Sequence, residues 1–111
     1  MILESAYLQV KPDQASEFEK VFRQASVLIA AMPGYVGHTL HHCLEDDHRY
    51  LLLVQWERLE DHTVGFRSSP EYQEWQRLLH HFYEPFPTVW HFELCFANHP
   101  PVGQETGDNN R

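Results

Sequence analysis

The sequence predicts one α+β domain of ferredoxin-like type, with its elements in the order βαββαβ. Segments with alternating or continuous apolar residues, typical of strands, are interspersed with segments in which apolar residues recur every three or four positions, as in helices. Pro and Gly residues mark several of the boundaries between them. The chain has 111 residues, which suits one hydrophobic core rather than two.

The first strand and helix are expected within residues 2–31. In the strand, residues 2–10, apolar positions alternate with polar or amphipathic ones, and Glu4 is the one break in the pattern. Pro12 stops the strand and suits the start of a helix. One face of the helix that follows is apolar: Phe18, Phe22, Ala25 and Ile29. Pro33 and Gly34 end that helix.

A β-hairpin is expected next, with strands at residues 35–44 and 49–57 and a polar turn between them. Residues 50–54 are apolar without alternation, which in an antiparallel sheet predicts that both faces are covered. Helices of this domain cover one face, and the chain has too few strands to build a second sheet. A partner subunit is the simplest cover, so we expect a homodimer.

The second half predicts a short helix over residues 59–68 and then a longer one, with Ser69 as its N-cap and Pro70 at its first position. That helix has an apolar stripe: Tyr72, Trp75, Leu78 and Leu79. The last strand is expected over residues 88–96, which completes a domain of residues 1–96. Residues 97–111 are polar and rich in Pro and Gly, so we expect a mobile tail.

Composition restricts the partners of the chain. Lys and Arg number 8 against 16 Asp and Glu, and the net charge of -8 disfavours nucleic acid and anionic membranes. There is no apolar stretch of about 20 residues and no basic-then-apolar leader, so we expect a cytoplasmic protein. Cys43 and Cys95 are expected to be two buried free thiols, with a disulfide as the unsupported alternative.

Several sequence features together resemble the antibiotic biosynthesis monooxygenase family. They are Trp56-Glu57 at the end of a strand, the helix restart at Ser69-Pro70, and the segment MPGYVGH before the second strand. The resemblance covers about residues 1–96. It implies that two ferredoxin-like chains join their sheets into a dimeric barrel. It also implies a choice among cofactor-independent oxygenases of aromatic polyketides or quinols, haem-degrading proteins, and members without known activity.

The functional residues of this family carry over unevenly. Trp56 matches the family's aromatic residue at the end of the third strand, but Phe66 stands where a His is usual on the following helix. His62 lies one helical turn earlier and can present an imidazole to the same pocket. The positions used for haem in the haem-degrading relatives hold Ala6, Gly65 and Trp75. None of these is an iron ligand, which disfavours haem degradation.

The favoured hypothesis is a monooxygenase that needs no cofactor and oxidises a small aromatic phenol or quinol. Such an enzyme needs a base in a water-excluding aromatic pocket. His62 is the candidate base, because an imidazole titrates near neutral pH, and Trp56, Phe66 and Tyr72 are the candidate walls. Tyr72 or Arg67 is the candidate partner of the developing oxyanion.

Other interpretations stay open. His62 can instead decorate an exposed helix while the aromatic residues are core, which suits a non-catalytic dimeric protein that binds a small ligand. Haem binding through one of the nine His residues is a less favoured alternative. Histidines at 41–42 and 80–81, and the pair His38 and His42 on one strand face, permit a metal site, but no ligand spacing specifies one, so none is expected. Hydrolase and dinucleotide motifs are lacking.

Overall fold

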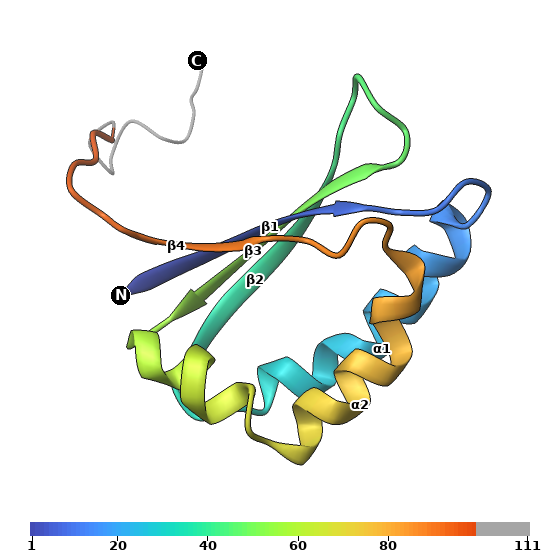
Figure 1. Ribbon diagram of the computed structural model, residues 1–111. Coiled ribbons are helices and arrows are strands. Elements are labelled where there is room, and N and C mark those ends of the chain that lie inside the picture. The colour runs from blue at the N-terminus through green and yellow to red at the C-terminus, as the bar shows by residue number, and fades with distance from the viewer. Residues whose placement is uncertain (100–111) are drawn as a thin grey trace, which may run out of the picture.

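A computed structural model describes residues 1–99 of the protein (Figure 1). Its elements are β1 (Ile2–Gln9), α1 (Ala15–Ala30), β2 (Tyr35–His42), β3 (Arg49–Trp56), the short helix η1 (Asp61–Phe66), α2 (Pro70–Leu79), η2 (His80–Phe82) and β4 (Val89–Glu93). The predicted βαββαβ order is therefore confirmed. The tail expected at residues 97–111 lies, from residue 100 onward, outside the described residues.

The four strands form one antiparallel sheet in the order β2-β3-β1-β4. This is the ferredoxin-like arrangement, in which each helix connects two strands that have another strand between them. Figure 1 shows α1 and α2 lying on the same face of this sheet, with η1 at one end of the layer.

Alternation along the central strands places the core between sheet and helices. Even-numbered residues of β1 and β3 point toward the helices and are buried: Glu4, Ala6, Leu8, Tyr50, Leu52, Val54 and Trp56. The predicted face of α1 packs against them with Phe18, Phe22, Ala25 and Ile29, and α2 contributes Trp75 and Leu79. Glu4 is thus the one carboxylate in this inner layer of the sheet.

Both predicted helix signals in the second half are found, with one change of geometry. Ser69 caps α2, since its Oγ accepts a hydrogen bond from the Tyr72 backbone N–H at 3.0 Å, and Pro70 opens the helix. The short helix expected over residues 59–68 is a π-helical turn restricted to Asp61–Phe66. This wider turn is a form often found at functional sites, and it directs His62 and Phe66 into the domain.

The other face of the sheet has no cover within the described chain. Tyr7 and Trp90 are 63% and 59% exposed there, and Leu51 and Leu53 of β3 are half-buried. Together with Phe92 they surround a hollow of about 430 Å³. An antiparallel sheet can face water on one side, but that side is then usually polar. The apolar character of both faces of β3, which the sequence predicted, is therefore present.

The prediction that both cysteines are buried was wrong, whereas the prediction that they are free thiols is confirmed. Cys43 is half-buried and Cys95 is exposed, and both are free thiols. Cys43 follows the edge strand β2, and Cys95 lies beyond the end of β4, so neither position reaches the core. Within the described residues, no helix has the length and apolar character needed to cross a bilayer.

Candidate functional site

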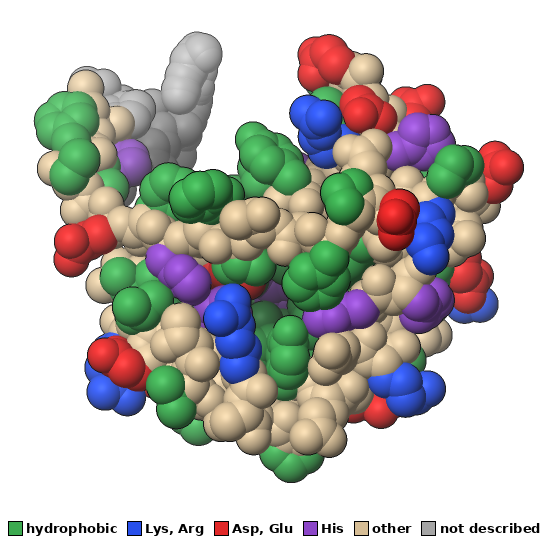
Figure 2. Space-filling model, in the orientation of Figure 1, with side chains coloured by type: hydrophobic (Ala, Val, Ile, Leu, Met, Phe, Trp, Pro, Cys, Tyr) green, Lys and Arg blue, Asp and Glu red, His purple; other side chains and the backbone are tan. Residues whose placement is uncertain are grey.

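A cavity of about 50 Å³ lies between the inner face of the sheet and the helices. Its walls are largely apolar and aromatic, and include Ala6, Leu52, Phe66 and Trp75. Figure 2 shows the surface hollowed below β4, with His side chains on either side of a cationic side chain. The cavity is thus an internal space that opens toward solvent beside α2.

His62, the predicted base, is 3% exposed and lies at the polar end of this cavity. Its Nδ1 is 2.8 Å from Nε2 of His91, and its Nε2 is 3.5 Å from Oε1 of Glu4. The ring stacks on Trp56 with 5.6 Å between centroids. Burial lowers the pKa of His62 to about 3, helped by the nearby charge of Arg67 and by His91. His62 is therefore a neutral imidazole at neutral pH.

Glu4 is one of two cluster residues that the sequence interpretation missed, and His91 is the other. Its side chain is buried, lines the cavity, and accepts a hydrogen bond from Nε1 of Trp56 at 2.9 Å. Desolvation raises the pKa of Glu4, and this outweighs the opposing effects of the Trp56 hydrogen bond and of Arg67. The signal was available, since Glu4 stands at an inward-facing position of an alternating strand, yet it was interpreted as a break in the pattern.

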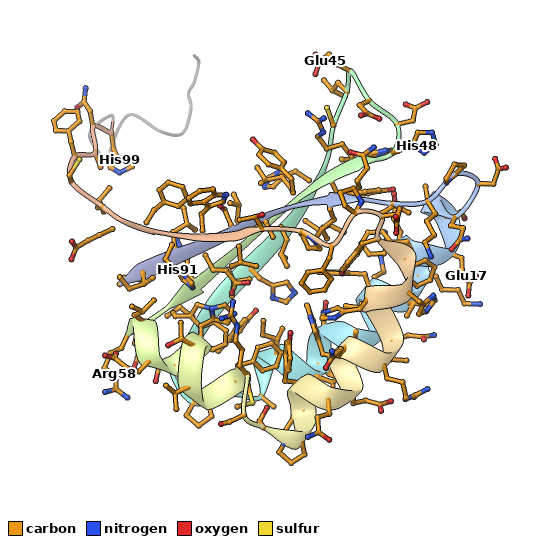
Figure 3. The ribbon with its side chains drawn as sticks, viewed as in Figure 1. Glu17, Glu45, His48, Arg58, His91 and His99 are labelled. Atoms are coloured by element: carbon orange, nitrogen blue, oxygen red, sulfur yellow. The ribbon has the colours of Figure 1, made fainter. Side chains whose placement is uncertain are left out.

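His91 joins this cluster through the pairing of β1 with β4. The register places Glu4 directly opposite His91. The side chains of residues directly opposite each other on paired strands lie on the same face of the sheet. Figure 3 shows His91 on β4 close to the short helix that carries His62. The His91 side chain is half-buried, so the cluster runs from the buried Glu4 to the molecular surface.

The predicted aromatic walls occupy different positions around the cavity. Phe66 is buried and lines it, and Tyr72 is half-buried and packs edge-on against Phe66 with 5.1 Å between centroids. Trp56 is fully buried and lies behind His62, where its ring supports the imidazole and its N–H binds Glu4. Trp75, which sequence reasoning placed in the stripe of α2, is a further wall.

Arg67 and Tyr72, the predicted oxyanion partners, stand at the mouth of the cavity. Arg67 is exposed yet close enough for its charge to affect Glu4, His62 and His91. Phe86, 63% exposed, lines the cavity from the loop before β4. Pockets for small ligands usually measure about 300–1,000 Å³. An aromatic ligand therefore fits only when side chains at this mouth turn outward.

The histidines of β2 considered as metal ligands have protein partners. His38 contacts the Tyr35 hydroxyl through Nδ1 and lies 3.1 Å from Oγ of Ser26 through Nε2. His42 uses Nε2 to bond the backbone carbonyl of Asp47 at 2.8 Å. Within residues 1–99, no group of three or more His, Cys, Asp or Glu side chains is arranged to hold a metal ion.

The positions that haem-degrading relatives use hold no iron ligand in this chain. Ala6 and Trp75 both line the cavity, and Gly65 lies on the exposed side of the π-helical turn. His80 is the one other His that lines the cavity within the described residues. Burial lowers its pKa. The polar groups at the end of the cavity are thus those of Glu4 and His62, with His91 in contact with His62.

A four-stranded antiparallel sheet with its helices on one face defines the ferredoxin-like class of α+β domains. The family model for antibiotic biosynthesis monooxygenases matches residues 1–78. The chain belongs to this family, and the resemblance predicted from the sequence is confirmed.

Individual relatives support the assignment. The uncharacterised protein YczJ of Bacillus subtilis strain 168 is 58% identical over 93 residues, which are 84% of this chain and 98% of the relative. A crystal structure from Bordetella bronchiseptica, provisionally described as an antibiotic biosynthesis monooxygenase, has a TM-score of 0.82 at 35% identity and covers 86% of this chain and 97% of the other.

A more distant structure shares the fold alone. It is a monooxygenase of Streptomyces coelicolor in complex with the ligand nanaomycin D, with a TM-score of 0.75 at 19% identity. The match covers 90% of this chain and 92% of the Streptomyces coelicolor chain.

Proposed function

We propose that the protein is a cofactor-independent monooxygenase that binds a small aromatic phenol or quinol in the cavity under the sheet. The observation that carries this proposal is the buried cluster of Glu4, His62 and His91 at the end of an aromatic-lined space. Family membership and the ligand-bound relative from Streptomyces coelicolor support a small-molecule role. Proton transfer in a water-excluding pocket is what such chemistry requires.

The reaction starts with removal of the phenolic proton by this cluster, in which His62 takes part. The electron-rich phenolate then supplies electrons to dioxygen, the oxidant. For an anthrone, a ring CH₂ and O₂ become a ring C=O and water: one oxygen atom enters the product and the other leaves as water. The substrate supplies all four electrons. The cationic Arg67 and Tyr72 both line the cavity, which supports assigning them to stabilise the phenolate.

We also propose that the protein works as a homodimer in the cytoplasm. Support for the dimer comes from the open sheet face, where Tyr7, Leu53, Trp90 and Phe92 form an apolar patch that a second copy would cover. The free thiols Cys43 and Cys95 suit a reducing compartment. Sedimentation equilibrium should give a dimer for the wild type, and the charge introduced by Leu53→Glu should shift it toward a monomer.

The function is tested by oxygen consumption of the metal-free protein with a panel of hydroquinones and anthrones. We expect uptake by the wild type and a large loss in His62→Gln, which keeps the size of the side chain but cannot carry a proton. His48→Gln is the matched control, because His48 is exposed in the loop between β2 and β3, away from His91 (Figure 3). Uptake that survives in His62→Gln would remove His62 from the chemistry.

The second candidate is a dimeric protein that binds a small aromatic ligand without turnover. The small volume of the cavity favours it, since about 50 Å³ leaves little room for both a ligand and dioxygen. Quenching of the Trp75 and Trp56 fluorescence by a panel ligand, with no oxygen uptake by any variant, would identify this function.

A further inference from the structure

We propose that Glu4 is the catalytic residue that takes the phenolic proton, and that His62 and His91 connect Glu4 to solvent. This inference rests on the proposed function and deepens it, since it assigns the first proton acceptor to a residue of β1. It is carried by the positions of Glu4 and His62 in the cavity wall and by the contact of His62 with His91.

The two imidazole nitrogens of His62 both face protein groups. Nδ1 meets His91 at 2.8 Å, and Nε2 faces Oε1 of Glu4 at 3.5 Å. Trp56 donates to that same Oε1. Within residues 1–99, Oε2 of Glu4 makes no protein hydrogen bond, although the side chain is only 6% exposed and lines the cavity. A buried carboxylate oxygen of this kind is available to a ligand hydroxyl.

The surroundings of Glu4 change the pKa of its carboxyl group. Burial raises the pKa of Glu4 from its ordinary value, which makes the carboxylate a stronger base. The groups that face it are Trp56 from β3, His62 from η1, His91 from β4 and the cation of Arg67. The Trp56 hydrogen bond and the charge of Arg67 both favour the ionised form of Glu4 and so oppose the effect of burial on its pKa.

The contacts within the cluster also define a path for that proton. A phenol O–H gives its proton to a Glu4 oxygen, which leaves a phenolate and a neutral carboxyl group. The carboxyl proton can pass to Nε2 of His62 while Nδ1–H of His62 passes to Nε2 of His91, and Nδ1–H of His91 passes to water. Each step breaks one N–H or O–H bond and forms another. One proton returns from solvent when the second oxygen atom leaves as water, so the balance closes.

The sequence pattern agrees with this role. β1 places the half-buried Leu3 and the exposed Tyr7 on its open face and buries Ala6 and Leu8 on its inner face, where an apolar residue at position 4 would fit the alternation. A carboxylate there requires desolvation, and replacement of buried polar groups by apolar ones often stabilises a protein. Glu4 therefore occupies a position that packing alone does not explain.

The test compares oxygen uptake by the wild type, Glu4→Gln, His91→Ala and the control His48→Ala. Glu4→Gln retains an oxygen to accept the Trp56 hydrogen bond but cannot take a proton. We expect its kcat to fall at least about 100-fold with KM changed less than about threefold, and the acidic limb of the pH profile to vanish. His91→Ala should lose about tenfold and recover with added imidazole; the control should not respond. Uptake within threefold of wild type in Glu4→Gln would overturn the assignment and leave the oxygenase proposal intact.

If the wild type consumes no oxygen with any substrate, the proposed reaction is refuted. A second measurement tests proton transfer to Glu4 even in that case. The probe is 4-nitrophenol, whose phenol and phenolate forms differ in visible absorption. Bound to the wild type below its solution pKa, it should show the phenolate spectrum, because Glu4 takes its proton. With Glu4→Gln it should show the phenol spectrum. Identical spectra with both proteins would overturn the assignment.

Discussion

Acidification should destabilise the folded protein through His62. In the unfolded chain this residue has the ordinary pKa of 6.5, and in the folded protein burial lowers the pKa to about 3. Below pH 6.5 the unfolded chain therefore binds a proton that the folded chain does not. The free energy of unfolding falls as the pH falls through this window, by about 1.4 kcal/mol per pH unit, until the folded pKa is reached.

The size of the effect follows from these two values. Between pH 7 and pH 4.5 the contribution of His62 to the free energy of unfolding should fall by about 2.5 kcal/mol. The cavity opens to solvent beside Arg67, and solvent screening reduces the shift, so we expect about 2 kcal/mol. Glu4 acts in the opposite direction, because its pKa is raised and it stabilises the fold as the pH falls toward 4.5.

The measurement is urea unfolding, followed by Trp fluorescence at both pH values and at one protein concentration. Wild type should lose about 2 kcal/mol more than His62→Gln between pH 7 and pH 4.5, since Gln does not titrate and Glu4 is present in both proteins. His48→Gln should behave as the wild type does. Equal pH dependence of wild type and His62→Gln would mean that the folded protein protonates His62 freely, which contradicts a neutral imidazole beside Glu4.

Three further substitutions test the framework of the site. Gly34→Ala should lower the free energy of unfolding, measured by urea unfolding, by at least about 2 kcal/mol. Gly34 has a φ of 83°, and an added Cβ would lie 2.0 Å from Oδ2 of Asp61. An unchanged unfolding midpoint would refute the predicted clash. Ser69→Ala should cost about 1 kcal/mol through loss of the α2 cap, whereas Ser68→Ala, at a residue outside the cap position, should cost less. Glu4→Gln should gain stability relative to wild type as the pH rises above 4.5, because ionisation of a carboxyl group with a raised pKa lowers the free energy of unfolding of the wild type. A relative loss of stability at high pH would mean that the ionised Glu4 stabilises the fold.

The sequence was sufficient for the fold because its signals are local. Alternation in β1, the four-residue spacing of Phe18 and Phe22, and the Ser69 cap each depend on neighbours within one or two turns of chain. The apolar run of β3 even indicated the uncovered sheet face. The register shift between Tyr35 and Gly37 in the β2–β3 pair had no such local signal.

The candidate site was predicted only in part, because its members come from four elements. His62 and Phe66 are one turn apart on η1 and were found together. His91 becomes the neighbour of Glu4 only through the register of β4 on β1, which is set by long-range pairing rather than by adjacent residues. Trp56 was expected to touch the ligand, yet its N–H is directed to Glu4 instead, a side-chain orientation that spacing alone does not determine.

The interior of this domain combines two demands that oppose each other. A small core gains most of its stability from apolar burial. In this sheet, however, Glu4 occupies an inward position of the central strand β1, and His91 occupies the position opposite it on β4. Trp56 offsets part of this cost by donating to Glu4 from within the core itself. A polar group held in this way, with one oxygen left toward a cavity, is pre-organised for a proton transfer rather than for packing. The arrangement of the cluster therefore favours chemistry at this site over storage of a ligand.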